Sequence, residues 1–178
     1  MDRISIKERA RENFTAQYWP VVGINVLAVV ILAGLGALSY IPILGLVAAF
    51  GLTPIITVGI LWFSLKIYRG EEATVETLFE PFQNFGHVLG GYWYMVLFIF
   101  LWSLLLFIPG IIKAIAYQMA PYILMDQPDI PATEALEKSM DMTDGHKWEI
   151  FVFDLSFLGW FLLAALTLDI VGFLYVFP

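Results

Sequence analysis

The strongest constraint on this chain is a long stretch without charge. No Asp, Glu, Lys or Arg occurs from Asn13 to Leu65. A transmembrane helix needs about 20 predominantly apolar residues to cross a hydrocarbon layer about 30 Å thick. The stretch is long enough for two crossings and the turn between them, so it predicts a pair of membrane-spanning helices.

The composition of the whole chain agrees with this prediction. Of 178 residues, 60% are apolar and 14% are charged, whereas about a quarter are charged in ordinary globular domains. We therefore expect a single integral membrane domain over residues 1–178. The chain has no cysteine, which excludes disulfides, thiolate metal sites and a cysteine nucleophile. Its net charge of −7 argues against a nucleic-acid partner, because phosphate binding requires concentrated Lys and Arg.

Interface aromatics divide the chain into three hairpins. Trp and Tyr favour headgroup depth, and they begin the hairpins at Tyr18-Trp19, Tyr92-Trp93 and Trp148. We expect an all-α fold, a polytopic transmembrane helical bundle with five spans plus a partial or truncated sixth. Its expected parts are an interfacial amphipathic helix (1–14), hairpin 1 (18–67), a cytoplasmic connector (68–91), hairpin 2 (92–125), a second cytoplasmic connector (126–147) and an incomplete hairpin 3 (148–178).

Prolines predict where the spans turn or bend. Pro42 falls in the outer turn of the first hairpin, and Pro109 falls in that of the second. Pro54 lies in the middle of the second span and is expected to kink it, with Thr53 and Thr57 available to satisfy freed backbone groups. Pro121 predicts a break near the inner end of the fourth span.

Both connectors are acidic, and each is expected to carry a short surface helix. The first has an apolar stripe of Val75, Leu78, Phe79 and Phe82. In the second, Ala132, Leu136 and Met140 share one helical face. Pro131 suits a first helical turn there, and Gly145 suits a helix end.

The basic residues predict the orientation. Those that fall on one side of this topology are Arg3, Lys7, Arg9, Arg11, Lys66, Arg69, Lys138 and Lys147. Cytoplasmic loops of membrane proteins carry an excess of Lys and Arg. We therefore expect a multi-pass protein of the cell membrane whose N-terminus and both connectors are cytoplasmic.

Polar residues inside the later spans are the candidates for a substrate- or lipid-binding site, because ionisable groups within a membrane are costly and often functional. They are Lys113, Tyr117, Gln118, Asp154 and Asp169. Their positions predict a polar cluster between spans four and five. The alternative is structural: Lys113 extends its amine to the interface, and the other side chains form interhelical hydrogen bonds.

No motif for catalysis or metal binding stands out. The chain has no P-loop, nucleophile elbow or zinc-protease helix motif. His87 and His146 fall at the cytoplasmic ends of spans three and five without the spacing of a known metal site. We expect no catalytic residue, no metal and no cofactor.

Stretches along nearly the whole chain resemble bacterial integral-membrane proteins grouped as domain of unknown function 975. The stretches that carry the resemblance are Met1-Asp2-Arg3-Ile4, Lys7-Glu8-Arg9-Ala10, Tyr18-Trp19, Arg69-Gly70-Glu71-Glu72, Phe85-Gly86, Phe107-Ile108-Pro109-Gly110-Ile111-Ile112-Lys113, Tyr122-Ile123-Leu124, Glu134-Ala135, Ser139, Gly145-His146-Lys147-Trp148-Glu149 and Leu155-Ser156-Phe157-Leu158-Gly159-Trp160. The family is more distantly similar to the membrane domain found beside some glycerophosphodiester phosphodiesterases.

The resemblance implies a six-span protein of bacterial plasma membranes with no established activity. The family defines no catalytic residues, so none is carried over. Members usually continue through a sixth helix and a polar tail beyond the point that corresponds to Pro178, so the resemblance implies that the last hairpin is incomplete.

Three functions remain open from the sequence. The first is a non-enzymatic membrane protein that binds membrane lipid, an envelope partner protein or a second copy of itself. The alternative is a small-substrate transporter that uses the polar cluster between spans four and five. The third is a membrane enzyme that acts at the cytoplasmic interface. A water-accessible cavity reaching Asp154 favours transport, whereas a dry bundle with apolar grooves favours binding.

Overall fold

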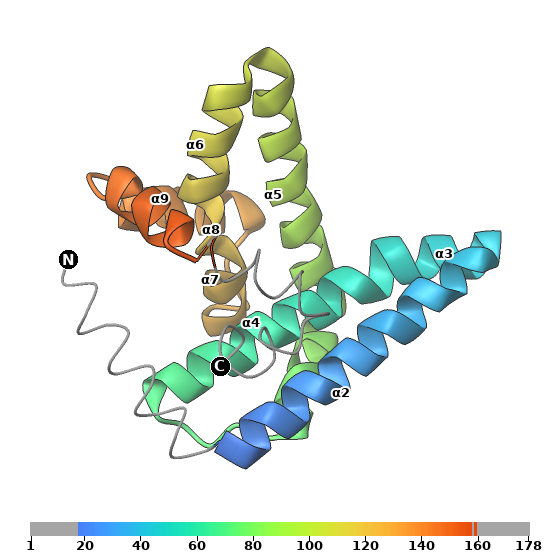
Figure 1. Cartoon of the computed structure of the whole chain (residues 1–178). Coiled ribbons are helices and arrows are strands. Elements are labelled where there is room, and N and C mark those ends of the chain that lie inside the picture. The colour runs from blue at the N-terminus through green and yellow to red at the C-terminus, as the bar shows by residue number, and fades with distance from the viewer. Residues whose placement is uncertain (1–17, 158, 160–178) are drawn as a thin grey trace.

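The computed structural model describes residues 18–157 and residue 159, and these residues form helices without any strand. The all-α prediction is therefore confirmed for this part of the chain (Figure 1). The expected amphipathic helix at 1–14 lies outside it. The helices are, in order, α2 (Tyr18–Ala37), η1 (Leu38–Tyr40), α3 (Pro42–Val47), η2 (Ala48–Leu52), α4 (Thr53–Arg69), η3 (Val75–Asn84), α5 (Phe85–Leu105), α6 (Phe107–Tyr117), α7 (Ala120–Asp126), α8 (Ala132–Thr143) and α9 (Lys147–Leu155).

The first hairpin pairs α2 with the continuous helical stretch α3–η2–α4. Its turn lies where the sequence predicted it: Ile41 is extended, with φ −107° and ψ 109°, and Pro42 begins α3. The proline ring presets the backbone angle that a first helical turn requires. Near the other end of the hairpin, Val21 and Ile24 of α2 are buried with Phe63 of α4 in one apolar cluster.

Pro54 interrupts the hydrogen bonding of this stretch. An α-helix at this point would use the amide of residue 54 as the donor to the carbonyl of Phe50, and proline has no such hydrogen. The helix widens into a π-helix over Ala48–Leu52 directly before Pro54, which is a recognised cause of bending. The Phe50 carbonyl accepts a hydrogen bond of 2.8 Å from the Trp93 indole nitrogen on α5.

Two other contacts lie close to Pro54. The Thr57 hydroxyl donates to the carbonyl of Thr53 at 2.9 Å; this is not the carbonyl that Pro54 leaves without a donor, so the bond does not play the role that the sequence suggested for Thr57. The rings of Phe50 and Trp93 stack with centroids 5.2 Å apart. The Phe50 carbonyl, which Pro54 leaves without its helical donor, thus accepts a hydrogen bond from Trp93 of the second hairpin.

The connector after α4 folds back against that helix. Gly70, with φ +76°, ends α4, and the amides of Gly70 and Glu71 donate to the carbonyls of Ile67 and Lys66, which is a Schellman motif. Helix η3 then packs along α4 so closely that a Cβ atom on Gly59 would lie 2.2 Å from the carbonyl oxygen of Leu78. A glycine is required at position 59 for this approach.

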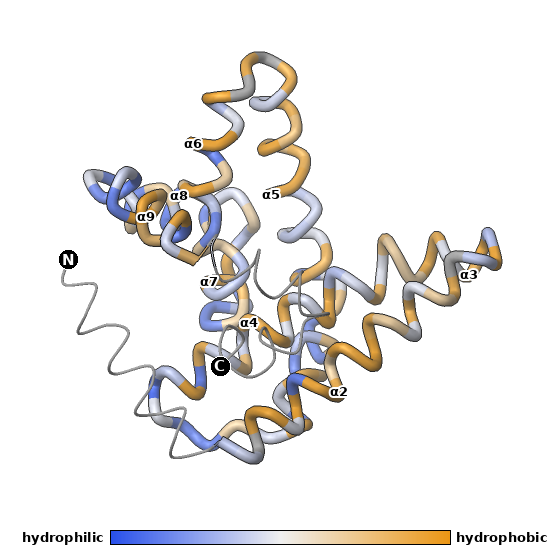
Figure 2. Tube along the Cα trace, in the orientation of Figure 1, coloured by the Kyte–Doolittle hydropathy of each residue, from blue (hydrophilic) through white to orange (hydrophobic). Residues whose placement is uncertain are grey.

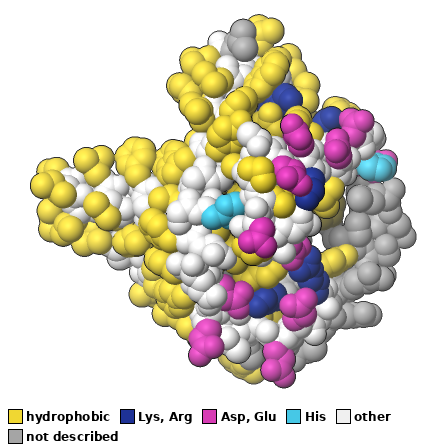
Figure 3. Space-filling view, turned by 180° about the vertical axis from the view of Figure 1, so that it is seen from behind, with side chains coloured by type: hydrophobic (Ala, Val, Ile, Leu, Met, Phe, Trp, Pro, Cys, Tyr) yellow, Lys and Arg dark blue, Asp and Glu magenta, His cyan; other side chains and the backbone are white. Residues whose placement is uncertain are grey.

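Ion pairs join the ends of several helices. Arg69, at the end of α4, makes two hydrogen bonds of 2.8 and 2.7 Å to the carboxylate of Asp126 at the end of α7. Glu80 of η3 accepts from Lys66 at 2.7 Å and from the Trp62 indole at 2.5 Å. Charged side chains gather over this part of the molecule, while the arm formed by α2 and α3 is apolar (Figure 3).

The second hairpin consists of α5 followed by α6 and α7. Its turn is a single extended residue, Leu106, so Pro109 falls inside the first turn of α6 rather than in the loop. Gly110 allows the close approach, because a Cβ atom there would lie 2.9 Å from the Cα of Ser103. In Figure 1 the α5–α6 hairpin and the α2–α4 hairpin diverge, and most of the length of their helices is hydrophobic (Figure 2).

Helix α8 confirms the helix expected in the second connector. Pro131 is its N-cap and Ala132 its first residue, while Gly145 has φ +72° just beyond its end. It packs against α5, α6 and α7, with Ala135, Leu136, Ser139 and Thr143 buried.

Three described helical runs are long and apolar enough to cross a membrane: Pro42–Arg69, Val75–Leu104 and Ile108–Asp126. Helix α2 contributes a shorter apolar run, Val21–Ala37. Only the start of the expected fifth span, α9, falls in the described part of the chain. The five-span topology therefore stays a prediction.

Replacing Gly59 tests the contact between α4 and η3. Gly59→Ala is expected to lower the free energy of unfolding by about 1–3 kcal/mol, because the methyl group meets a backbone carbonyl that must shift. Gly23→Ala is the control: nothing lies within 4 Å of its Cβ position on exposed α2, and Ala favours a helix over Gly. Thermal unfolding in detergent measures both. Equal stability of the two variants would contradict the close contact.

A double-mutant cycle tests the bond between Trp93 and Phe50. Trp93→Phe is expected to destabilise the fold by about 1 kcal/mol, because it removes the indole donor. In the background of Pro54→Ala the same change is expected to matter less, since an alanine there supplies a backbone amide to that carbonyl. Trp19→Phe, at a residue that is 79% exposed, controls for loss of an indole. If Trp93→Phe destabilises the fold equally with Pro54 and with Ala at position 54, the lost amide of residue 54 is not what the Trp93 indole replaces at the Phe50 carbonyl.

Candidate functional site

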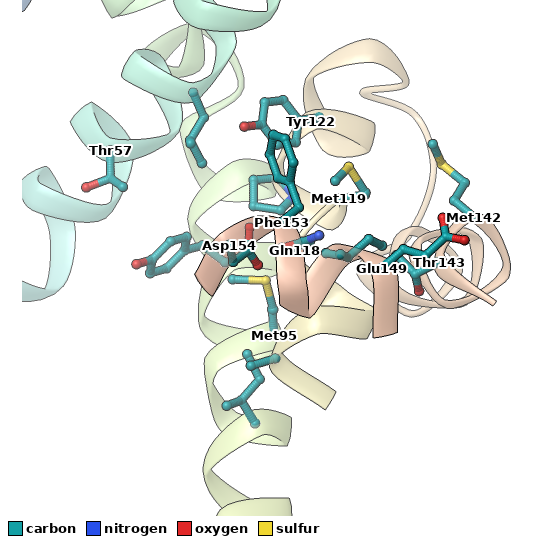
Figure 4. A pocket seen from close by; sticks show the side chains of 16 residues that line it. Thr57, Met95, Gln118, Met119, Tyr122, Met142, Thr143, Glu149, Phe153 and Asp154 are labelled. Atoms are coloured by element: carbon teal, nitrogen blue, oxygen red, sulfur yellow. The ribbon is translucent and has the colours of Figure 1, made fainter. Parts of the chain in front are cut away.

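A cavity of about 710 Å³ opens between the two hairpins and α9. Its volume falls within the roughly 300–1,000 Å³ typical of small-molecule sites. The 16 lining residues are Thr57, Leu61, Tyr92, Met95, Ile99, Ala114, Gln118, Met119, Pro121, Tyr122, Met142, Thr143, Glu149, Ile150, Phe153 and Asp154 (Figure 4).

The wall of this cavity is amphiphilic. Its apolar part includes Leu61 of α4 and Met95 and Ile99 of α5. Its polar part includes Gln118 and the carboxylates of Glu149 and Asp154. Neither Lys nor Arg occurs among the lining residues that the structure describes.

A break in the fourth span places Gln118 at the cavity. Helix α6 ends at Tyr117 and α7 begins at Ala120, because Pro121 offers no amide to the carbonyl four residues earlier. The break near Pro121 that the sequence predicted is confirmed.

Ser139 of α8 satisfies backbone groups at that break. Its side chain is fully buried, and its hydroxyl donates to the Ala116 carbonyl at 2.7 Å and accepts from the Met119 amide at 3.2 Å. Such a side chain lets an interrupted helix persist away from water. The break is thus held in place, and the residues within it, Gln118 and Met119, are left to line the cavity.

Helix α9 supplies the acidic wall. Residues 149, 150, 153 and 154 share one of its faces by helical spacing, and all four line the cavity. The carboxylate of Asp154 makes no side-chain hydrogen bond or ion pair with any described residue. Glu149 lies 3.5 Å from the Nδ1 atom of His146, which pairs with it when protonated.

The turn before α9 has its own ion pair outside the cavity. Lys147 donates a hydrogen bond of 2.9 Å to Asp144. This hydrogen bond, with the positive charge of Lys147, holds the pKa of Asp144 below its usual value. Lys147 is therefore matched with a partner other than the carboxylates of the cavity.

The structure divides the candidate residues from the sequence into separate groups. Gln118 and Asp154 both line the cavity, whereas Lys113 and Tyr117 do not. Tyr117 is 4% exposed and belongs to the core beneath α8. Asp169 lies outside the described residues.

Lys113 is held by aromatic rings and a thioether. Its amine lies 5.2 Å from the ring centroid of Trp102, 5.3 Å from that of Tyr117 and 3.3 Å from the Met140 sulfur. These contacts lie outside the cavity lining, so the described part of the chain does not bring Lys113 together with Gln118 and Asp154.

Several lining residues were not candidates from the sequence. Glu149 and Phe153 share the face of Asp154 on α9, and helical spacing from Asp154 would have found them. Thr57, Met95 and Met142 come from three other helices. Their convergence depends on how those helices pack, for which the sequence carries no local signal.

A metal site is not found in the described part of the chain, where no group of three or more His, Cys, Asp or Glu residues is arranged to hold an ion. The Nε2 atom of His87 is buried without a hydrogen-bond partner among the described residues. Neither histidine lines the cavity.

Residues 93–178 match the model of a family described as Protein of unknown function (DUF975). The resemblance seen in the sequence is thereby supported for this part, which includes most of α5 and all of α6 to α9. Neither the curated proteins nor the solved structures contain a match to the chain. The likeness to the glycerophosphodiester phosphodiesterase membrane domain stays a prediction.

Replacing Ser139 tests the support of the break. Ser139→Ala is expected to lower the free energy of unfolding by about 1–3 kcal/mol, because it removes both hydrogen bonds that this buried hydroxyl makes to the backbone at the break. Ser64→Ala is the matched control, since that exposed hydroxyl bonds only within its own helix. Chemical unfolding in detergent compares the two. A loss no larger than that of Ser64→Ala would contradict the role given to Ser139.

Proposed function

We propose that this chain is a non-enzymatic integral membrane protein that binds an amphiphilic molecule from the membrane in the cavity beside α9. The observation that carries this proposal is the cavity itself, which joins an apolar wall on α4 and α5 to a polar wall on α9. An amphiphile matches both walls at once.

The surface of the helices supports a membrane environment. The run Val75–Leu104 is long and apolar enough to cross a membrane, yet only 11% of its most apolar window is buried within the described structure. Large exposed apolar surfaces are unfavourable in water. Hydrocarbon chains would cover such a surface without a penalty.

The distribution of charge supports an orientation. Lys66, Arg69, Lys138 and Lys147 belong to the helix ends and connectors that form the charged part of the molecule (Figure 3). The excess of basic residues on cytoplasmic loops favours this part as the cytoplasmic side of a cell membrane.

Transport is the second candidate function. The cavity reaches Asp154 and lies at the break between α6 and α7, and interrupted helices form the substrate sites of many transporters. Movement of a bound molecule across proteoliposomes would establish transport. Retention without movement would leave a binding protein.

Native mass spectrometry tests whether the cavity is occupied. Protein extracted from membranes in detergent is expected to carry bound amphiphile, and Ala114→Phe is expected to reduce the bound fraction at least tenfold by filling the cavity. Ala33→Phe on the exposed side of α2 is the matched control and is expected to retain it. Thermal unfolding verifies that both variants are folded. Absence of adducts in the unaltered protein, or equal adducts in both variants, would overturn the proposal.

A further inference from the structure

We infer that the cavity selects amphiphiles that carry a positive charge, such as quaternary organic cations with an apolar body. This inference rests on the proposed function, because it names the class of molecule that the same cavity takes.

Charge is the first argument. The charged residues of the lining are Glu149 and Asp154, both acidic. At pH 7 two carboxylates attract a cation, and the attraction is stronger in a site walled by apolar side chains than in water. The imidazole of His146 lies 3.5 Å from Glu149 and adds a positive charge there only when it is protonated.

The lysines and arginines of the described part of the chain have partners elsewhere. The pairs are Lys66 with Glu80 at 2.7 Å, Arg69 with Asp126 at 2.7 Å, Lys138 with Glu134 at 3.0 Å and Lys147 with Asp144 at 2.9 Å. Lys113 is held by aromatic rings, as described above. None of these described side chains therefore neutralises Asp154, whose carboxylate is left facing the cavity as a group that a cationic ligand could pair with.

The aromatic lining is the second argument. Tyr92, Tyr122 and Phe153 contribute rings to the wall, and the negative face of an aromatic ring attracts organic cations. Within this protein one side-chain cation is already held in this way, since the amine of Lys113 lies over the rings of Trp102 and Tyr117.

The thioethers of Met95, Met119 and Met142 also line the cavity. Methionine side chains are flexible and adapt to different apolar shapes. The wall thus fits a cation with an apolar body of variable form. An anionic phosphate headgroup is disfavoured, because the described lining offers no Lys or Arg to bind it.

The test uses two ions of the same shape and opposite charge, tetraphenylphosphonium and tetraphenylborate. Each is titrated against the detergent-purified protein, and the component of binding that Ala114→Phe removes is taken as binding in the cavity. We expect the phosphonium ion to bind there at least tenfold more tightly than the borate ion.

Asp154→Asn is expected to weaken phosphonium binding about tenfold, and Glu149→Gln is expected to weaken it in the same direction. Asp141→Asn, at an exposed acid on α8 outside the cavity, is the control and is expected to leave binding unchanged. Thermal unfolding verifies that each variant is folded. If Asp154→Asn does not fold, the effect of Glu149→Gln on phosphonium binding decides the test.

The charge selectivity is overturned if both ions bind equally in the cavity, or if neither Asp154→Asn nor Glu149→Gln changes phosphonium binding. Either result would leave the proposed function intact. A different result would reject the proposed function itself. In that case Ala114→Phe removes no binding of either ion, and native mass spectrometry detects no adduct.

Discussion

The structure depends on side chains that bond the backbone where two prolines interrupt the helices. Pro54 removes a donor from the first hairpin, and the indole of Trp93 occupies the carbonyl of Phe50 from the second hairpin. Pro121 interrupts the fourth span, and Ser139 bonds the Ala116 carbonyl before the break and the Met119 amide within it. Away from water, an unpaired backbone group has no alternative partner. At each irregularity, a side chain from a different helix therefore bonds the interrupted backbone, and this bond fixes the position of that second helix.

These repairs explain why the cavity lies where it does. Trp93 is on α5 next to Tyr92, whose ring lines the cavity, and Ser139 holds open the break at which Gln118 lies. The ion pair between Arg69 and Asp126 joins α4 to α7 on the charged side. The cavity is thus bounded by helices that are tied together at defined points, and α9 adds its acidic face to α6.

The sequence predicted much of this architecture from local signals. The helices, the first turn, the irregular helical turn before Pro54 and the break at Pro121 follow from apolar runs and proline positions, which act within a few residues. The candidate site was predicted in part. Gln118 and Asp154 share a cavity, but Lys113 and Tyr117 pack elsewhere, since aromatic partners hold the lysine amine. The likeness of residues 93–178 to a family of unknown function adds no activity.

That the chain forms long apolar helices follows from local sequence alone, because the stretch from Asn13 to Leu65 without charge leaves no face suited to water. The positions at which those helices are interrupted follow in the same way, because proline lacks the amide hydrogen. The packing of the helices, in contrast, sets which distant groups bond to the backbone at those interruptions. It also sets which side chains of α4, α5, α8 and α9 meet at one cavity. Those contacts join residues far apart in the chain, and their distances depend on helix packing that no local pattern encodes.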